Sequence, residues 1–244
     1  MPCYQLFPVY EFMKTHIIGC GGVASYFLPP FLKTLRYDAN HKRRRAVILH
    51  DGDALEERNL QRQNFAQSAI RANKAEALAL QFDWYSTLEV SPRYIDAAFR
   101  VDECDTIIIM ADNHLARRHA LDAADRAAGV HVLSAANSTI GAEAWWYDAD
   151  RDKDSPRDPR VRWPEILTDE SGSPIHAEGC ASESRLRDVP QTPIANFMAA
   201  SHLLLLWNFV FNERPKLDAK MTRDFWPISF SNTATSTETL RFAA

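Results

Sequence analysis

The stretch HIIGCGGVASYF, residues 16–27, decides the fold. It is an apolar run that breaks into three glycines, Gly19, Gly21 and Gly22, within four positions and then resumes. A strand, a glycine loop and a helix in this order typically bind nucleotides. Backbone N–H groups at the start of the helix face an anionic phosphate, and the missing side chains let the phosphate approach. We therefore expect these three glycines to contact a phosphate.

Short aliphatic runs alternate with helix-like segments in the first part of the chain. The pattern predicts strands at residues 16–20, 46–51, 105–113 and 130–137, and helices at residues 23–37, 73–85 and 116–129. Such alternation is typical of parallel strands with helical crossovers, so the expected fold class is α/β, a Rossmann-like doubly wound, mostly parallel sheet. Pro29 and Pro30 are expected to end or kink the first helix near Leu28.

The remainder of the chain has a different character. Residues 148–193 are charged and rich in proline, which indicates a long crossover loop. An apolar helix is expected over residues 192–213, followed by a terminal strand or hairpin over residues 225–242. We therefore expect a single domain, residues 1–244, with a nucleotide-binding half (1–147), the crossover loop (148–193) and a C-terminal part (194–244).

The composition argues against several classes of protein. A formal charge of −4 and a pI near 6.1 argue against nucleic-acid or membrane-surface binding, because such partners need a clustered excess of Lys and Arg. The four cysteines form no CxxC pair and do not resemble a disulfide framework, so a cytoplasmic location is expected. The apolar stretch at residues 197–211 is too short to span a bilayer and is expected to be a buried helix.

A carboxylate ends the second predicted strand. Asp51 is the expected acceptor for ribose hydroxyls, although it lies farther from the glycine loop than the usual ~20 residues. NAD, FAD and ATP would all use such a carboxylate. The glycine loop and Asp51 therefore do not choose between these nucleotides.

The block EERNLQRQNF, residues 56–65, follows this strand and makes the choice. A dinucleotide pyrophosphate carries about two charges, which the loop amides largely satisfy, whereas a triphosphate carries about four and demands added cations. Arg62 and Lys74 can supply the cations, while Asn59 and Gln63 offer neutral donors. The block thus favours a triphosphate, and the alternative is a polar turn with solvated charges.

Asp112 and Asn113 end the strand TIIIMADN and should project at the same edge of the sheet as Asp51. A carboxylate beside a polyphosphate is repelled unless a divalent cation lies between them, so Mg²⁺ is implied, with Asp112 as its ligand. The alternative is that Asp112 caps the helix that follows.

These segments together resemble the ThiF/MoeB/HesA superfamily, the adenylating fold of ubiquitin-activating enzymes. The matching segments are GCGGVAS, DGDALEERNLQRQNF, RANKAEAL and ADNHLARR, in the same order and at similar separations, over residues 17–141. Within the superfamily the chain is similar to stand-alone ThiF-type proteins of plasmids and operons. The resemblance implies that ATP and Mg²⁺ are used to adenylate the C-terminal glycine of a small ubiquitin-like protein, with release of pyrophosphate.

The resemblance also implies roles for particular residues. Gly22 and its neighbours approach the phosphates, Asp51 takes the ribose and Asp112 binds the metal. Phosphate binding falls to Asn59, Arg62 and Lys74, and the same nucleotide site includes Asp53, Gln63 and Asn113. Arg62, Lys74 and Asp112 would then act in catalysis as well as in binding.

Cys180 matches the position of a cysteine that, in conjugating members of the family, attacks the acyl adenylate to form a thioester. An ordinary loop or core cysteine is the alternative. The resemblance further implies a homodimer, and a conjugating enzyme as a possible later partner. The family's usual N-terminal arginine has no equivalent before the glycine loop, where only Lys14 precedes it, and Arg58 is the alternative for its role. The family's zinc-binding cysteine pairs are absent from this sequence.

Other functions remain open at this point. A nicotinamide-dependent oxidoreductase explains the glycines and Asp51 but leaves Arg62, Lys74 and Asp112 without a role. The same adenylation chemistry on a peptide or on a tRNA is a second alternative, although the acidic composition disfavours tRNA. A non-catalytic subunit is disfavoured because the nucleotide-binding residues are all present.

Overall fold

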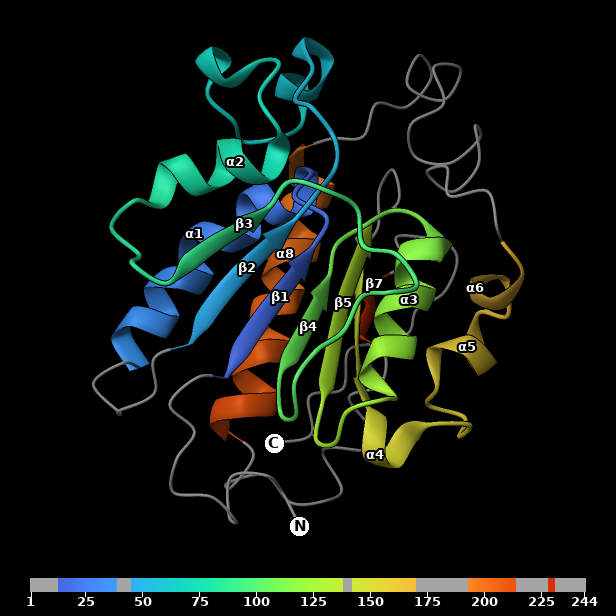
Figure 1. Cartoon of the computed structure of the whole chain (residues 1–244). Helices are drawn as coiled ribbons and strands as arrows, with labels where there is room; N and C mark the ends of the chain where they lie inside the picture. The colour runs from blue at the N-terminus through green and yellow to red at the C-terminus, as the bar shows by residue number, and fades with distance from the viewer. Residues whose placement is uncertain (1–12, 39–44, 138–141, 170–192, 214–227, 231–244) are drawn as a thin grey trace.

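The computed structural model describes residues 13–38, 45–137, 142–169, 193–213 and 228–230. Their strands form one sheet with the order β3-β2-β1-β4-β5-β6-β7 (Figure 1). The bounds are β1 (Lys14–Ile18), β2 (Ala46–His50), β3 (Leu88–Ser91), β4 (Thr106–Ile109), β5 (His131–Asn137), β6 (Ala142–Asp148) and β7 (Ile228–Phe230). The first five strands pair in parallel, while β6 and β7 are antiparallel to their neighbours. The predicted mostly parallel, Rossmann-like sheet is confirmed.

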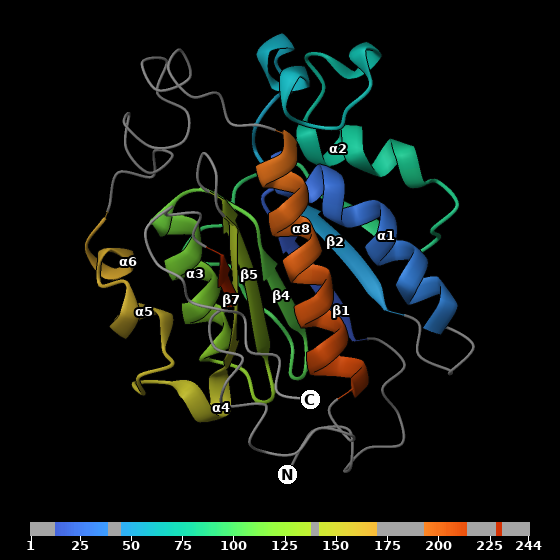
Figure 2. The same ribbon diagram turned by 180° about the vertical axis from the view of Figure 1, so that it is seen from behind.

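Helices cover both faces of the sheet (Figure 2). The helices α1, α2 and α8 lie on one face, and α3, α5 and α6 lie on the other. The bounds are α1 (Gly22–Asp38), α2 (Lys74–Ala79), α3 (His114–Ala124), α4 (Ala149–Asp152), α5 (Pro159–Arg162), α6 (Glu165–Thr168) and α8 (Pro193–Asn208), with short helical turns η3 (Glu57–Gln61), η4 (Gln67–Ala69), η5 (Leu80–Phe82) and η6 (Phe209–Glu213).

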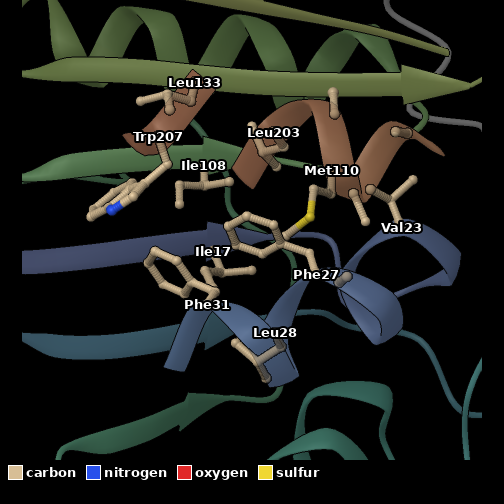
Figure 3. Packing of buried hydrophobic residues seen from close by; sticks show 14 of the residues in the cluster. Ile17, Val23, Phe27, Leu28, Phe31, Ile108, Met110, Leu133, Leu203 and Trp207 are labelled. Carbon is tan, nitrogen blue, oxygen red and sulfur yellow. The ribbon is translucent and has the colours of Figure 1, made fainter. Parts of the chain in front are cut away.

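The core is divided in two by the sheet because successive strand residues point to opposite faces. Ile17, Ile108 and Leu133 pack toward α1 and α8, where Phe27, Phe31, Leu203 and Trp207 meet them (Figure 3). Ile18, Ile107 and Val132 pack on the other face with Leu121 of α3. The central strands are buried on both sides, as is usual for parallel sheets.

The first helix continues through its two prolines, so of the two expected outcomes, an end or a kink near Leu28, the end is wrong. Helix α1 extends from Gly22 to Asp38 and contains Pro29 and Pro30. An interior proline costs about 3 kcal/mol. Leu28 and three other large apolar side chains of this helix are fully buried, at about 1.5–3 kcal/mol each, and this burial outweighs the lost hydrogen bonds. The other three are Phe27, Phe31 and Leu32.

The apolar helix predicted over residues 192–213 is present as α8 and η6. Pro193–Phe211, at 19 residues, is long and apolar enough by length and composition to cross a membrane, so length does not exclude a span. Core helices of soluble proteins pass the same test, and 56% of this segment is buried in the fold. Leu203, Leu206 and Trp207 pack in the core beside the sheet, which explains the apolar character without a membrane.

Several smaller expectations change. The helix predicted at residues 73–85 is shorter, because α2 ends at Ala79 and only a turn, η5, follows. Trp145 and Trp146 lie on opposite faces of β6, one in each half of the core, and both are buried. Strand β7 lies within the predicted terminal strand or hairpin, and the rest of that segment lies outside the described residues.

The predicted crossover loop, residues 148–193, is in part regular structure. The helices α4, α5 and α6 occupy its first half, and Arg160 of α5 anchors them to the sheet layer. Its guanidinium lies 2.9 Å from carboxylate oxygens of both Asp125 and Asp158 and donates to the hydroxyl of Tyr147. Residues 170–192 lie outside the described part of the chain.

The cysteines in the structure do not support the predicted cytoplasmic location. Cys20 is a buried free thiol, and burial raises the pKa of that thiol well above its usual range. Cys104 is disulfide-bonded, in contrast to the expectation that the cysteines form no such bond. Disulfides are rare in a reducing cytoplasm. The location of the protein is therefore no longer indicated by its cysteines.

Candidate functional site

The topology places a candidate site at the carboxyl ends of the neighbouring strands β1 and β4, between which the strand order reverses. From β1 the chain proceeds outward through β2 and β3, then returns to build β4 and β5 on the other side of β1. Ligands of open α/β sheets bind at such a switch point, beyond the carboxyl ends of the strands. The glycine loop follows β1 and Asp112 follows β4, so both lie at this point.

Gly19 holds the two strand exits together. Its φ is +89°, a conformation that side chains other than glycine rarely adopt. A Cβ atom at this position would lie 2.6 Å from the backbone nitrogen of Ala111, beyond β4. The Gly19 N–H donates to the carbonyl of His50 at 3.0 Å. Gly19 therefore serves the packing of backbone on backbone.

Gly21 and Gly22 differ in what surrounds them. A Cβ atom on Gly22 would lie 2.4 Å from Nδ2 of Asn196, so Gly22 makes room for a side chain of α8. A Cβ atom on Gly21 would meet only Nε2 of Gln63, at 3.8 Å. Of the three glycines of the loop, Gly21 is the one with open space beside it, and a phosphate could approach the backbone there.

The side chain of Asp51 holds the backbone of the glycine loop in place through hydrogen bonds. Its side chain is only 7% exposed. One carboxylate oxygen accepts the N–H of Cys20 at 2.7 Å, and the other accepts the N–H of Asp53 at 2.8 Å. Burial raises the pKa of Asp51, while these backbone hydrogen bonds and the charge of Lys74 oppose the rise. The expected ribose acceptor thus has both oxygens engaged in holding the chain.

Asp53 and Lys74 meet at the rim of the site. Nζ of Lys74 lies 2.8 Å from one oxygen of Asp53, and the hydroxyl of Tyr94 donates to the other oxygen. The Asp53 side chain is 48% exposed, against 11% for Lys74. Burial raises the pKa of Asp53, but the hydrogen bonds from Lys74 and Tyr94 lower it further, so the net shift is downward. Asp53 is the more accessible of the two carboxylates.

Asn73 fixes Lys74 in place. Its side-chain oxygen caps α2 by accepting the N–H groups of Ala75 and Glu76, and its amide donates to the carbonyl of Asp51 at 2.8 Å. Lys74 is the first residue of α2, and its own N–H donates to the carbonyl of Asp53 at 2.9 Å. Hydrogen bonds therefore join Asp51 and Asp53, which follow β2, to the start of α2.

The turn η3 and the residues directly after it carry further polar residues of the predicted site. Asn59 is buried, and its side-chain oxygen accepts the N–H of Glu56 at 3.0 Å, so its amide closes the turn. Gln63 is 8% exposed, and its Oε1 is buried without a hydrogen-bond partner among the described residues. A buried amide with unused hydrogen-bonding capacity beside Gly21 indicates a place where a polar ligand would be accepted.

Asn196 of α8 is a structural residue of the site that sequence reasoning did not identify. Its Nδ2 donates to the carbonyl of Arg62 at 2.8 Å, and its Oδ1 accepts from Nδ2 of Asn137 at 3.0 Å. It therefore joins η3, the start of α1 and the end of β5. The sequence signal was weak, because Asn196 is one of several polar residues in a mostly apolar helix.

Asp112 and Asn113 follow β4, and the structure shows which of them caps the helix α3. Asn113 is the N-cap of α3, and its side-chain oxygen accepts the N–H of Ala116 at 2.7 Å. Asp112 is exposed, and it makes no hydrogen bond or ion pair with another described residue. The capping function thus belongs to Asn113, whereas Asp112 is exposed and lies directly after β4, at the switch point.

No group of three His, Cys, Asp or Glu side chains suited to a metal occurs among the described residues. Mg²⁺ is commonly held by one or two carboxylates together with substrate phosphates, so Asp112 alone is compatible with such a site. Cys180, the expected thioester cysteine, lies outside the described residues.

A buried polar chain supports the loop from the opposite face. Nδ1 of His16 lies 3.1 Å from Nε2 of His50, and Nε2 of His16 lies 3.2 Å from a carboxylate oxygen of Asp105. Phe99 covers both imidazole rings edge-on. Burial lowers the pKa of His50 to about 4, and the charges of His16 and Arg93 add to the effect. His50 is therefore neutral in the folded protein at neutral pH.

The low pKa of His50 predicts that the folded protein loses stability in mild acid. The unfolded chain binds a proton at His50 below pH 6.5, whereas the folded protein does so only near pH 4. Neutral His50 therefore contributes about 3 kcal/mol to the free energy of unfolding above pH 6.5, and this contribution falls as the pH drops toward 4. Urea unfolding of the wild type and of His50→Gln at pH 7 and pH 4.5 measures it. The variant should lose less stability on acidification, and equal losses would contradict the assignment.

Comparisons with solved structures support the fold. The structure of E. coli MccB with ATP is similar, with a TM-score of 0.54, 17% sequence identity and coverage of 82% of this chain and 57% of that chain. The microcin C7 biosynthetic enzyme MccB in complex with N-formylated MccA gives a TM-score of 0.52 at 16% identity, with coverage of 81% of this chain and 57% of that chain. No protein-family model and no curated protein matches the sequence.

At 16–17% identity these similarities show the fold alone, and they agree with the Rossmann-like sheet that the sequence predicted. They do not support the narrower similarity to stand-alone ThiF-type proteins. The chain spans 57% of the length of the MccB chain. Over most of its own length, this protein has the fold of MccB.

Proposed function

We propose that this protein is an ATP-dependent adenylyltransferase that activates a terminal carboxylate of a polypeptide. The observation that carries the proposal is the convergence of Gly21, the Asp53–Lys74 pair and Asp112 at one switch point of the sheet. An oxidoreductase would need the glycine loop and a ribose acceptor but neither the lysine nor the free carboxylate. Structures of MccB with ATP and with MccA support the same chemistry by similarity of fold.

The proposed reaction needs positioning and charge stabilisation. The substrate carboxylate attacks the α-phosphorus of ATP, the bond from that phosphorus to the bridging oxygen breaks, and pyrophosphate leaves with the electron pair. Lys74 and Arg62 would neutralise the charge that develops on the phosphates. No general base is required, because the attacking carboxylate is already ionised at neutral pH.

Asp112 would hold Mg²⁺ in this proposal, since it offers an exposed carboxylate beside the phosphate loop. When bound, the ion supplies further neutralisation of phosphate charge. Asp53 is the better-placed acceptor for a ribose hydroxyl, because its side chain is 48% exposed whereas Asp51 is buried. Asp51 would then act on the nucleotide through the loop that it organises.

Two classes of polypeptide fit the proposed chemistry. The sequence resemblance favours a small ubiquitin-like protein that ends in glycine, whereas MccB acts on a peptide. Both present a free C-terminal carboxylate, so the proposed chemistry is the same for either substrate. The composition, with a net charge of −4, continues to disfavour tRNA.

Exchange of labelled pyrophosphate into ATP tests the proposal. The probes are MccA, a ubiquitin-like protein that ends in Gly-Gly, and each of these with its terminal carboxylate amidated. Exchange that requires Mg²⁺ and a free carboxylate is the expected result, and the active probe identifies the substrate class. Absence of ATP binding, or exchange that is equal with amidated probes, would contradict the proposal.

Cys180 is proposed to accept the activated acyl group if the substrate is ubiquitin-like. Attack of its thiolate on the acyl adenylate would form a thioester and release AMP. Cys180→Ala should abolish any adduct that thiol reagents can reverse, while leaving pyrophosphate exchange intact. Gel electrophoresis of samples with and without prior treatment with dithiothreitol detects the adduct. An adduct that persists in the variant would remove Cys180 from the mechanism.

A homodimer is also proposed, and the outer face of α8 supports it. Ile194, Phe197 and Leu205 lie on one side of this helix and are 67%, 58% and 63% exposed. A helix that is apolar all round is normally buried on every side. Phe197→Glu should therefore convert a dimer to a monomer in light scattering, and a wild-type protein that is already monomeric would contradict this assignment. A cytoplasmic location and a conjugating partner remain expectations of the same proposal.

A further inference from the structure

Tyr94 belongs to the candidate site although nothing in the sequence pointed to it. It follows β3, whose carboxyl end lies beside that of β2, and the N–H of Asp51 donates to the carbonyl of Ser91 at 3.3 Å. The tyrosine is 65% exposed, yet it is held at two points. Its ring lies against Gly52, where a Cβ atom would be 2.6 Å from Cε2, and its hydroxyl donates to Asp53.

These contacts fix the orientation of the Asp53 carboxylate. Lys74 binds one oxygen at 2.8 Å and the Tyr94 hydroxyl binds the other. A carboxylate has about four lone-pair positions, so about two remain free to accept hydrogen bonds. An acceptor that is already oriented loses less entropy when a ligand binds, and its remaining lone pairs point in fixed directions.

The Tyr94 hydroxyl keeps its proton at neutral pH. Its hydrogen bond to Asp53 raises its pKa most, and partial burial and the charges of Asp53, Asp51 and Asp112 raise it further. The hydroxyl therefore lies in the field of the carboxylates that surround the proposed nucleotide site. It acts there as a donor rather than as an anion.

We propose that Tyr94 is a positioning residue that holds Asp53 in the orientation that accepts a ribose hydroxyl, so that it sets selectivity for ribonucleotides over deoxyribonucleotides. The inference rests on the proposed function, since it requires that a nucleotide binds at this edge. Gly52 contributes to this arrangement, because only a residue without a side chain lets the Tyr94 ring lie this close to the backbone.

Calorimetric titration with Mg-ATP, Mg-2′-deoxy-ATP and Mg-3′-deoxy-ATP tests the inference without any turnover. The wild type should prefer ATP over at least one deoxy analogue by about tenfold or more, as a hydrogen bond to a charged group provides. In Tyr94→Phe, which lacks the donor, and in Gly52→Ala, which displaces the ring, the preference should fall to about threefold or less. Tyr37→Phe is the matched control, because Tyr37 is also exposed but lies at the end of α1.

The outcomes separate this inference from the proposed function. A wild type that binds ATP, with an unchanged ribose preference in Tyr94→Phe and Gly52→Ala, overturns the role of Tyr94 and leaves the proposed function standing. Tighter ATP binding by Tyr94→Phe also overturns it, because the hydroxyl would then compete with the nucleotide for Asp53. A wild type that binds none of the three nucleotides overturns the proposed function, and the inference falls with it.

Discussion

Replacing Lys74 by methionine is expected to lower pyrophosphate exchange by about 100- to 1000-fold, the cost of removing a fixed donor from developing charge. Nζ of Lys74 is the one cation that the structure holds against a carboxylate of the candidate site by a hydrogen bond within the described residues, 2.8 Å from Asp53. Asn73 caps the start of its helix, so the ammonium group of Lys74 extends from a fixed backbone position.

Lys33→Met is the matched control for this prediction. Lys33 is exposed on α1, outside the candidate site, and its loss should leave exchange at the wild-type level. Lys74→Met should also keep the wild-type urea midpoint, because Asp53 is half exposed and retains its hydrogen bond from Tyr94. A Lys74 variant that exchanges pyrophosphate as fast as the Lys33 variant would exclude this lysine from the reaction.

Gly19→Ala is expected to have the largest effect on stability, a loss of about 3 kcal/mol or more in the free energy of unfolding. Two independent causes add. An alanine at φ +89° is strained, and its Cβ would be 2.6 Å from a backbone nitrogen that cannot rotate away. Urea unfolding measures the loss. The clash pushes apart the exits of β1 and β4, so nucleotide binding should be lost together with stability.

Gly21→Ala, two positions along, makes a sharp comparison. The added Cβ meets only Nε2 of Gln63 at 3.8 Å, so stability should change by less than about 1 kcal/mol. Nucleotide binding should nevertheless weaken, because the methyl group occupies the open space beside the loop. If Gly21→Ala bound Mg-ATP as well as the wild type does, the phosphate would not approach the loop at this glycine. Equal stability of the two variants would contradict the role assigned to Gly19.

The sequence predicted the order of the central strands and helices well, because buried parallel strands are continuous aliphatic runs. It failed at α1, where burial of Phe27, Leu28 and other side chains overrides two prolines. It also missed β3, whose residues Leu88–Ser91 are only partly buried and therefore carry no strong apolar signal. Tyr94 was missed for the same reason, since its place at the site depends on that strand.

The candidate site was predicted in composition but not in detail. Asp51, Asp53 and Lys74 do come together, yet the structure assigns Asp51 to the backbone of the loop. A sequence shows that a strand ends in a carboxylate, but not which neighbours its oxygens accept from. Gly19 and Gly22 likewise serve close packing with Ala111 and Asn196, which are distant in sequence. Local patterns cannot show contacts of that range.

Calorimetric titration of the wild type and of Arg62→Ala with Mg-ATP and with NADH tests the central claim most directly. ATP is expected to bind the wild type only with Mg²⁺, and Arg62→Ala is expected to lose this binding. ATP at 100 times its dissociation constant should also stabilise the wild type by about 2.7 kcal/mol, which a thermal shift can verify. Binding of NADH without binding of ATP would mean that the glycine loop holds a dinucleotide, and it would contradict the proposed adenylation.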